Sequence, residues 1–326
     1  MNKEQLPLVS IVTPSYNKGA FIEETIMSVR KQGYPHIEHI VVDGGSTDIT
    51  LEILRKHADG LVWISEPDKG QSDAINKGWK MSKGEILAYL NADDTYLPNA
   101  VETAVKFLVQ NRELHMIYGD CNIIDERGQT VARYPASEFN LVDLIVGVNM
   151  VPQPTVFFAR RVLDDVGYLD PTLHLAMDYD FWVRMALKCR IRYIPKVLAN
   201  FRVCAGSKSV ERSPEFADDM LHTLDKLFST PALPNEIQAL RRRAYGNVHL
   251  GRAVHYRSSG QLRESRKHLM EALRVDPRFF LTHSWPWFYL ATSFLGASVN
   301  NMIFKWARWL TGQNKCRNSM NTGNPA

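Results

Sequence analysis

Cysteine is scarce in this sequence, and its four cysteines lie far apart. They are Cys121, Cys189, Cys204 and Cys316. No two of them have the C-x-x-C spacing of many zinc sites, and nothing in their positions indicates a disulfide framework. This usage suits a reducing compartment, so we expect a cytoplasmic protein without structural zinc.

Long hydrophobic runs are also missing. The longest apolar stretch runs from Trp285 to Val299 and is interrupted by Thr292, Ser293 and Ser298, so it is shorter than the roughly 20 apolar residues of a membrane-spanning helix. The N-terminus is polar and leads directly into a strand-like segment, without the apolar core of a secretory signal. We therefore expect a protein that is soluble or bound only to the surface of a membrane.

A strong charge of one sign is absent, because the formal net charge of the 326 residues is +4. That excess is too small to indicate nucleic-acid binding. It is uneven, however, since basic residues cluster at 241–243 and 263–267. This C-terminal part could make peripheral contact with an anionic membrane surface, or the clusters could be solvated helix faces and no more.

What is present is a regular alternation of strand-like and helix-like segments over residues 8–90. Apolar, β-branched runs at 8–13, 39–43, 61–65 and 86–90 alternate with helical spacing at 21–29, 51–54 and 72–81. This pattern is typical of βαβ units, so we expect an α/β fold with a mostly parallel sheet flanked by helices. Beyond residue 112 the pattern is mixed, with strands expected at 116–118, 154–158, 192–194 and 198–201, and helices at 142–146 and 179–188.

The C-terminal part is expected to be helical. Residues 205–235 are polar and rich in proline, which suggests a boundary, and residues 238–277 resemble one helix pair of the tetratricopeptide type. A single pair cannot form a solenoid, because stacked neighbours are needed to bury its apolar faces. We predict an α/β domain at 1–230 and a helical appendage at 231–326 that contains an aromatic-rich segment at 279–310.

Polar loops follow the four predicted strands of the first half. They are Pro14–Asn17 (PSYN), Asp43–Asp48 (DGGSTD), Glu66–Asp73 (EPDKGQSD) and Asn91–Asp94 (NADD). Because the carboxyl ends of parallel strands meet at one edge of a sheet, we expect these loops to converge on a ligand site. Taken singly, Ser46, Asp48, Ser72 and Asp73 could instead be N-caps of the helices that follow.

Two acidic segments are candidates for chemistry. Adjacent carboxylates such as Asp93 and Asp94 repel each other unless a cation or solvent relieves them, and hard oxygen ligands suit Mg²⁺ or Mn²⁺. Asp178, at the predicted start of a helix, could accept the proton of an alcohol nucleophile, or it could be an N-cap. Asp180 and Arg184 could form an i,i+4 ion pair.

In order and spacing, five motifs of the chain resemble the family 2 glycosyltransferases. They are PSYNKGAFIEETIMSVRKQ, VVDGGSTD, SEPDKGQSDAINKG, LNADD and MDYDFWVRMA, which lie within about residues 8–205. The resemblance implies the GT-A fold, with residues 1–230 as the catalytic domain. It implies an inverting, metal-dependent transfer of a sugar from a nucleotide-sugar, a UDP-sugar before GDP- or dTDP-sugars, to a hydroxyl acceptor.

The resemblance also implies roles for single residues. Asp178 would be the catalytic base, and Asp93 would coordinate Mn²⁺ or Mg²⁺. The nucleotide-sugar would be bound by Pro14, Ser15, Tyr16, Asn17, Asp43, Lys69, Asp73, Asn91, Ala92 and Asp93. The acceptor or the donor diphosphate would be contacted by Gln153, Trp182, Arg202, Ser207 and Lys208, the last three on a loop that closes over the diphosphate.

Four positions depart from the pattern of many relatives. Gly44 stands where a second acid is common, Asn91 replaces the first acid of the metal motif, Cys204 stands near a position that is often histidine, and Met177 replaces a glutamate. These departures put more weight on Asp93 for the metal. They leave the contacts to the nucleobase and any role of position 204 open.

Two other functions stay open. A nucleotidyltransferase shares a nucleotide-binding α/β core and an acidic metal site, but it usually has a Gly-rich, basic loop where this chain has Pro14–Asn17. A non-catalytic nucleotide-sugar-binding scaffold would use the helical appendage to recruit partners. For the acceptor, the resemblance suggests a saccharide or lipid-linked oligosaccharide of a bacterial envelope, an analogy that the fold alone does not establish.

Overall fold

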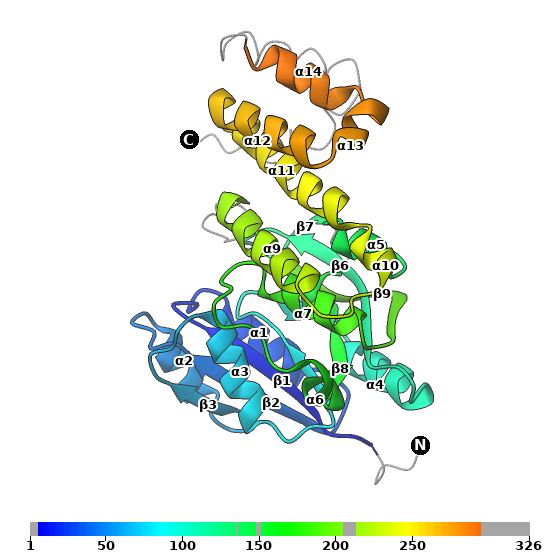
Figure 1. Ribbon diagram of the computed structural model, residues 1–326. Helices are drawn as coiled ribbons and strands as arrows, with labels where there is room; N and C mark the ends of the chain where they lie inside the picture. The colour runs from blue at the N-terminus through cyan, green and yellow to red at the C-terminus, as the bar shows by residue number, and fades with distance from the viewer. Residues whose placement is uncertain (1–5, 135, 148–150, 205–212, 295–326) are drawn as a thin grey trace, which may run out of the picture. The chain divides into compact units, whose positions relative to one another are not determined.

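The structure, a computed structural model, describes residues 6–134, 136–147, 151–204 and 213–294 (Figure 1). The chain divides into two compact units, residues 1–238 and 239–326. The sequence predicts this division after residue 230. The first unit therefore also holds the short helix α10 (Asn235–Gln238).

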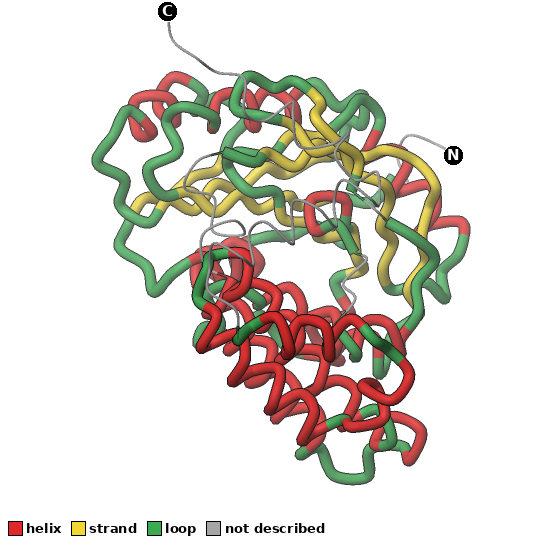
Figure 2. Tube along the Cα trace, turned by 90° about the horizontal axis from the view of Figure 1, so that it is seen from above, coloured by secondary structure: helices red, strands yellow, loops and turns green. Residues whose placement is uncertain are grey.

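Among the described residues, one mixed sheet of nine strands lies in the first unit (Figures 1 and 2). Neighbouring strands follow the order β3-β2-β1-β4-β8-β6-β9-β5, and β7 pairs with β6. The strands are β1 (Val9–Ser15), β2 (Ile37–Asp43), β3 (Val62–Ser65), β4 (Ile86–Tyr89), β5 (Thr95–Tyr96), β6 (Met116–Ile124), β7 (Thr130–Arg133), β8 (Phe157–Ala159) and β9 (Ile191–Arg202).

The parallel half of the sheet, β3-β2-β1-β4, has the βαβ order that the sequence predicts. Val9 of β1 lies opposite both Ile37 of β2 and Ile86 of β4 in parallel register. All of β1 is buried, which explains its run of apolar and β-branched residues, because a strand covered on both faces has no polar side. The α/β prediction is confirmed, and the carboxyl ends of these strands meet at one edge.

The second half departs from a simple parallel order. β8 lies antiparallel between β4 and β6, while β9 runs parallel to β6. The strand expected at 154–158 begins only at Phe157, because Gln153–Thr155 forms a 3₁₀ turn. The strands expected at 192–194 and 198–201 are one continuous strand, β9, whose register against β6 shifts beside Asp120.

Helices cover both faces of the sheet. On one face, α3 (Gln71–Met81) packs against β1 and β2, and Gly78 allows a close approach because a Cβ there would lie 2.4 Å from Val12 Cγ1. Ile11 and Val41 point to the opposite face. There Val41 packs with α1 (Ile22–Arg30) and α2 (Thr50–Lys56), and Ile11 belongs to a cluster with α4 (Ala100–Gln110).

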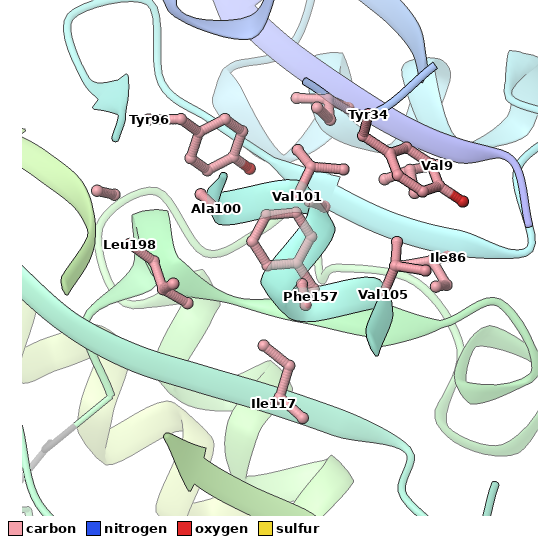
Figure 3. Packing of buried hydrophobic residues seen from close by; sticks show 14 of the residues in the cluster. Val9, Tyr34, Ile86, Tyr96, Ala100, Val101, Val105, Ile117, Phe157 and Leu198 are labelled. Atoms are coloured by element: carbon pink, nitrogen blue, oxygen red, sulfur yellow. The ribbon is translucent and has the colours of Figure 1, made fainter. Parts of the chain in front are cut away.

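That cluster lies between α4 and the middle of the sheet (Figure 3). Its buried side chains include Val101 and Val105 of α4, Ile117 of β6, Phe157 of β8 and Leu198 of β9. Burying a side chain of this kind stabilises a fold by about 1.5–3 kcal/mol. The cluster therefore holds together the strands whose ends carry the candidate site.

Further helices of the first unit pack beyond the sheet. α7 (Met177–Ala186) contacts α9 (Ser213–Phe228). The buried Asp180 carboxylate of α7 pairs with Arg184 at 2.8 Å and with Lys226 of α9 at 2.7 Å. The predicted i,i+4 ion pair is therefore confirmed, and it has a partner on a second helix. The short helices nearby are α5 (Leu141–Ile145) and α6 (Arg161–Val166).

The second unit, taken by itself, is helical as predicted. α11 (Arg241–Ser258) and α12 (Leu262–Val275) form the expected helix pair, and Gly260 supplies the positive φ of +78° at the turn. α13 (Pro277–Thr282) and α14 (Trp285–Thr292) hold the first part of the aromatic-rich segment, and residues 295–310 lie outside the described range. No helix in the described part of the chain is long and apolar enough to cross a membrane.

Candidate active site

A pocket of about 380 Å³ lies at the carboxyl ends of the parallel strands. The loops after β1, β3 and β4 reach it, and the start of α7 and the end of β9 add to its wall. The expected site residues that line it are Pro14, Ser15, Tyr16, Asn91, Ala92, Asp93, Gln153, Asp178 and Arg202. Those that do not line it are Asn17, Asp43, Lys69, Asp73 and Trp182. Ser207 and Lys208 lie outside the described residues.

The loop after β2 supports the pocket without lining it. The fully buried Asp43 carboxylate accepts hydrogen bonds from the Gly45 and Ser46 amides and from the Ser46 and Ser65 hydroxyls. Ser46 Oγ accepts the Asn17 amide at 2.7 Å, so this loop also fixes the loop after β1. Asp43 organises the loops in this structure, and its expected contact with the nucleotide stays a prediction.

The loop after β3 contributes a different set of residues from the one expected. Lys69 is exposed, and the Asp73 carboxylate, in the first turn of α3, accepts the Lys69 backbone amide at 3.1 Å. Asp68 and Gln71 line the pocket instead. The N-cap position of α3 is Gly70, so the alternative that Asp73 is the N-cap is wrong.

The first loop offers two groups to a ligand. Tyr16 lines the pocket with 61% of its surface exposed, so its ring is free to stack on a planar group. Ser15 is 4% exposed, and its hydroxyl has no hydrogen-bond partner among the described residues. A buried polar group without a partner is costly, so a pocket-lining hydroxyl of this kind indicates a ligand that completes it.

The acidic pair after β4 divides into one partly buried carboxylate that faces the pocket and one fully buried carboxylate. Asp94 is fully buried and accepts hydrogen bonds from the Arg202 amide and from Asn91 Nδ2. Burial, and then the charge of Asp93, raise the pKa of Asp94 well above its usual range. Asp93 lines the pocket, and its Oδ2 lies 2.6 Å from Lys18 Nζ. Only one acid of the pair is thus placed to meet a cation in the pocket.

Amide side chains connect this motif to two other pocket walls. Asn91 accepts a hydrogen bond from Gln71 at 2.7 Å and donates to Gln153 at 3.2 Å. Gln153 in turn donates to the Tyr89 carbonyl at the end of β4. The three pocket-lining amides therefore hold each other in place.

Asp178 lies in the first turn of α7 and faces the pocket. Among the described residues its carboxylate accepts one hydrogen bond, from the Tyr179 amide at 2.7 Å. Burial raises the pKa of Asp178 to about 6. A carboxylate with a raised pKa and few hydrogen bonds is suited to accept a proton from a ligand.

The N-terminus of α7 is capped by a residue from another helix. Asp219 Oδ2, on α9, accepts the amides of His174, Leu175 and Ala176 at 3.0, 2.7 and 3.0 Å. A carboxylate here also interacts favourably with the positive end of the helix dipole. Because Asp219 has the capping role, the alternative that Asp178 is the N-cap is wrong.

Two expectations need correction. Arg202 is not on a mobile closing loop; it ends β9, is 2% exposed, and its guanidinium donates to the carbonyls of Asp93, Asp125 and Glu126 and pairs with Glu24. Its donors are engaged with the protein. Trp182 is fully buried beside Phe181 and does not line the pocket.

Several pocket residues were not singled out from the sequence. They are Lys18, Asp68, Gln71, His174 and Phe216. Lys18, Asp68 and Gln71 lie inside the motifs that follow β1 and β3, so their position was a usable signal. His174 and Phe216 come from the approach to α7 and from α9, where no local pattern points to a site.

The profile of the family described as Glycosyl transferase family 2 matches residues 10–163. An uncharacterized glycosyltransferase of Mycobacterium tuberculosis is 33% identical over 215 residues, which are 65% of this chain and 81% of that protein. The putative teichuronic acid biosynthesis glycosyltransferase TuaG of Bacillus subtilis is 37% identical over 210 residues, 62% of this chain and 82% of TuaG. A longer glycosyltransferase of Rickettsia felis matches over only 36% of its length.

Two solved structures share the fold. Residues 1–349 of S. aureus TarS in complex with UDP-GlcNAc align with a TM-score of 0.58 at 18% identity, over 82% of this chain and 91% of that one. The mannosyltransferase PcManGT of Pyrobaculum calidifontis, in complex with GDP-Man and Mn²⁺, aligns with a TM-score of 0.57 at 19% identity, over 92% and 88%. At these identities the likeness establishes the GT-A type of α/β fold, as predicted.

Proposed function

Because the chain belongs to glycosyl transferase family 2, we propose that it transfers a sugar from a nucleotide-sugar to an acceptor hydroxyl, with inversion at the anomeric carbon. The observation that carries this proposal is Asp178, a pocket-lining carboxylate whose pKa burial raises to about 6. Among the described residues its carboxylate accepts one hydrogen bond, from the Tyr179 amide, so an oxygen stays available to the acceptor.

The donor in this proposal is a UDP-sugar bound along the loops after β1 and β4. The exposed ring of Tyr16 would stack on the base, and the Ser15 hydroxyl would gain its missing partner from the nucleotide. Support comes from the two structural neighbours, which are complexes with UDP-GlcNAc and GDP-Man, respectively. A GDP- or dTDP-sugar is the alternative donor that the nucleotide screen below separates.

In the proposed reaction, Asp178 takes the proton of the acceptor hydroxyl while that oxygen attacks the anomeric carbon. The new C–O bond forms on the face opposite the nucleotide, and the bond from the anomeric carbon to the diphosphate breaks with its electron pair on the leaving oxygen. A positioned general base of this kind contributes about 10²–10⁴-fold to a rate. The side-chain amides of Asn91, Gln71 and Gln153 would orient the sugar between the Asp178 carboxylate and the diphosphate.

A divalent cation fits the acidic motif if the nucleotide shares in holding it. Asp93 offers one carboxylate to the pocket, and no group of three or more His, Cys, Asp or Glu side chains among the described residues could hold a metal. Mg²⁺ and Mn²⁺ are commonly bound through one or two carboxylates plus substrate phosphates. Asp93, with Asn91 beside it, would hold the ion, which when bound would stabilise charge on the departing diphosphate.

The acceptor proposed is a saccharide or a lipid-linked saccharide of a cell envelope, with the second unit in contact with the membrane that carries it. The similarity to TuaG, a putative teichuronic acid biosynthesis glycosyltransferase, supports the first part. For the second, residues 239–326 hold 14 Lys and Arg against three Asp and Glu. The exposed side chains of Leu281, Trp287, Phe288 and Phe294 lie in the same unit.

The proposal is tested first by nucleotide binding and then by turnover. Thermal unfolding of the purified chain is followed with UDP, GDP, dTDP and CDP, each with and without Mn²⁺, because a ligand of the folded state raises the apparent stability. We expect one nucleotide to raise the melting temperature in a metal-dependent manner, and Asp93→Ala to abolish that shift. No shift with any nucleotide at millimolar concentration would contradict the donor site.

Turnover is then measured as release of nucleoside diphosphate from the matching nucleotide-sugar. We expect Asp178→Asn to keep the nucleotide-dependent thermal shift and to lose at least about a hundredfold in rate. Asp164→Asn, an exposed aspartate of α6 outside the pocket, is the matched control and should keep the wild-type rate. Full turnover by Asp178→Asn would remove Asp178 as the base, and binding without turnover by the wild type would favour a non-catalytic scaffold.

A further inference from the structure

Lys18 is held at the mouth of the pocket by the start of α1. Its amide donates to Thr50 Oγ1 at 3.0 Å, and its carbonyl accepts the amides of Phe21 and Ile22 at 2.9 Å each. The backbone of this lysine is therefore tied to both α1 and α2. From that fixed point the side chain reaches Asp93, and its Nζ lies 2.6 Å from Asp93 Oδ2.

This ion pair is partly shielded from water. The side chains of Lys18 and Asp93 are 35% and 17% exposed, respectively. Because both side chains are partly buried, water and salt screen the attraction between their charges less than at the surface. The neighbouring Asp94 does not offer a second oxygen to the pocket, since its oxygens accept the Arg202 amide and Asn91 Nδ2 inside the protein. A cation that binds at this acidic motif must therefore use the carboxylate that Lys18 already holds.

A divalent ion and the Lys18 ammonium exclude each other at this carboxylate. Two cations a few ångströms apart on one acid repel each other, and the repulsion is strong in a partly buried site. If the ion comes in, the ammonium has to leave Asp93, and a lysine without a counter-charge in a pocket needs a new anion. A nucleoside diphosphate supplies both the missing metal ligands and that anion.

We propose that Lys18 is a tethered counter-ion of Asp93 that keeps divalent metal out of the free protein and releases the carboxylate only when a nucleoside diphosphate enters with the metal. This inference rests on the donor site of the proposed function. It makes binding of metal and nucleotide cooperative, and by linkage each ligand must then strengthen the other by the same factor. Lys18 would be a residue that sets the order of binding, distinct from the base.

The first test measures Mn²⁺ binding to the full chain without nucleotide, from the electron paramagnetic resonance signal of free Mn²⁺. We expect Lys18→Met to bind Mn²⁺ roughly tenfold or more tightly than the wild type, because the competing cation is gone. Lys18→Gln serves as a second variant should the methionine disturb folding. Lys83→Met, which removes an exposed lysine outside the pocket, should leave the affinity unchanged.

The expected gain in Mn²⁺ affinity of Lys18→Met must depend on the Asp93 carboxylate. In the double variant Lys18→Met/Asp93→Asn, the tight Mn²⁺ site should disappear. Equal Mn²⁺ affinity of wild type, Lys18→Met and Lys18→Gln would overturn the inference. A gain that persists without the Asp93 carboxylate would overturn it as well, because the metal would then be bound elsewhere.

The second test adds UDP to the same titration. We expect UDP to increase the Mn²⁺ affinity of the wild type by a larger factor than that of Lys18→Met, since only the wild type has an ammonium to displace and re-engage. Equal factors would contradict the proposed exchange. The metal titration does not depend on turnover, so an absence of transfer with every donor would reject the proposed function while the gain in Lys18→Met still stood.

Discussion

At the scale of the residue, the burial of Asp178 affects both its proposed role as a base and the stability of the fold. Burial raises the pKa of this carboxyl to about 6, well above the ordinary value of 3.8. The native fold therefore holds the ionised form less well than the unfolded chain does. The loss in free energy of unfolding that comes from ionising this buried carboxyl is absent below about pH 4, grows between pH 4 and 6, and is fully present above pH 6.

This raised pKa predicts a pH profile for transfer. Asp178, the proposed base, must be ionised to accept a proton, so we expect the rate to be constant above about pH 6 and to fall about tenfold per pH unit below it. The measurement is the initial rate at saturating donor between pH 4.5 and 8. A rate that stays constant down to pH 4.5 would contradict the assignment of the base.

The same residue predicts a stability gain when it is removed. Asp178→Asn should raise the free energy of unfolding at pH 8 by at most about 3 kcal/mol, and the gain should vanish near pH 4. Thermal unfolding of the variant and the wild type at both pH values measures the difference. Asp164→Asn should show no such difference, since Asp164 is exposed. A gain of equal size at both pH values would point to a cause other than charge.

Several pocket residues near the ends of β1 and β4 could be predicted from the sequence. Asp93, Asn91 and Ser15 directly follow or end parallel strands, and they line the pocket as the sequence suggested. Arg202 was misjudged because its cationic side chain is engaged by backbone carbonyls that lie 76 or more residues away in sequence. Asp219 could not be found, because its three amide partners are 43–45 residues away.

At the scale of the element, α3 packs closely against β1 at Gly78. A Cβ there would lie 2.4 Å from Val12 Cγ1 and 2.8 Å from Cγ2. Val12 is fully buried in the strand that leads into the pocket. A side chain at position 78 would therefore push α3 away from β1, and α3 begins at Gln71 in the pocket wall.

This packing predicts opposite effects for two alanines. Gly78→Ala should lower the free energy of unfolding by about 1–3 kcal/mol through overpacking. Gly251→Ala in α11, where an added Cβ meets nothing within 4 Å, should raise it by about 0.5–1 kcal/mol through helix propensity. Calorimetric melting of both variants beside the wild type checks the signs. A stabilising Gly78→Ala would show that α3 can shift without strain.

The elements that could be predicted are those with a single clear period. The strands β1 to β4 and the helices between them follow from their hydrophobic spacing and from the turn residues that separate them. The second half of the sheet was harder, because β8 inserts antiparallel between β4 and β6 and the long β9 changes register beside Asp120. Pairing partners and bulges depend on distant segments, which local periodicity does not contain.

At the scale of the whole molecule, charge is divided along the chain. Residues 1–238 hold 25 Lys and Arg against 32 Asp and Glu, and residues 239–326 hold 14 against three, so the formal charges are −7 and +11 with histidine neutral. The net charge of +4 conceals this division. Each basic residue near an anionic membrane surface contributes about 1 kcal/mol of attraction.

The division predicts binding to anionic vesicles. We expect the full chain to cosediment with vesicles that contain phosphatidylglycerol, and to bind pure phosphatidylcholine weakly. Lys267→Glu/Arg274→Glu, at side chains 68% and 79% exposed, should weaken binding at least about tenfold, and 0.5 M salt should do the same. The matched control Lys31→Glu/Lys83→Glu changes exposed lysines of the first unit and should have a smaller effect.

A variant that lacks exposed aromatic side chains distinguishes insertion of apolar groups into the membrane interface from electrostatic attraction to the membrane surface. Trp287→Ser/Phe288→Ser removes two half-exposed rings of α14 and should weaken vesicle binding even at low salt, because apolar side chains add burial in the interface. If neither double variant in the second unit changes cosedimentation, the proposed membrane contact is wrong.

The Asp219 cap has a consequence for engineering this enzyme. The helix that carries Asp178 is anchored at its first turn by a residue encoded more than 40 positions later, on α9. A chimera that takes the segment with α7 from a relative but keeps α9 of this chain combines parts of two proteins. Asp219 of this chain would then have to cap a helix that comes from the other protein. The unit of exchange therefore runs through residue 228, and a graft that stops at 204 separates Asp178 from the residue that anchors its helix.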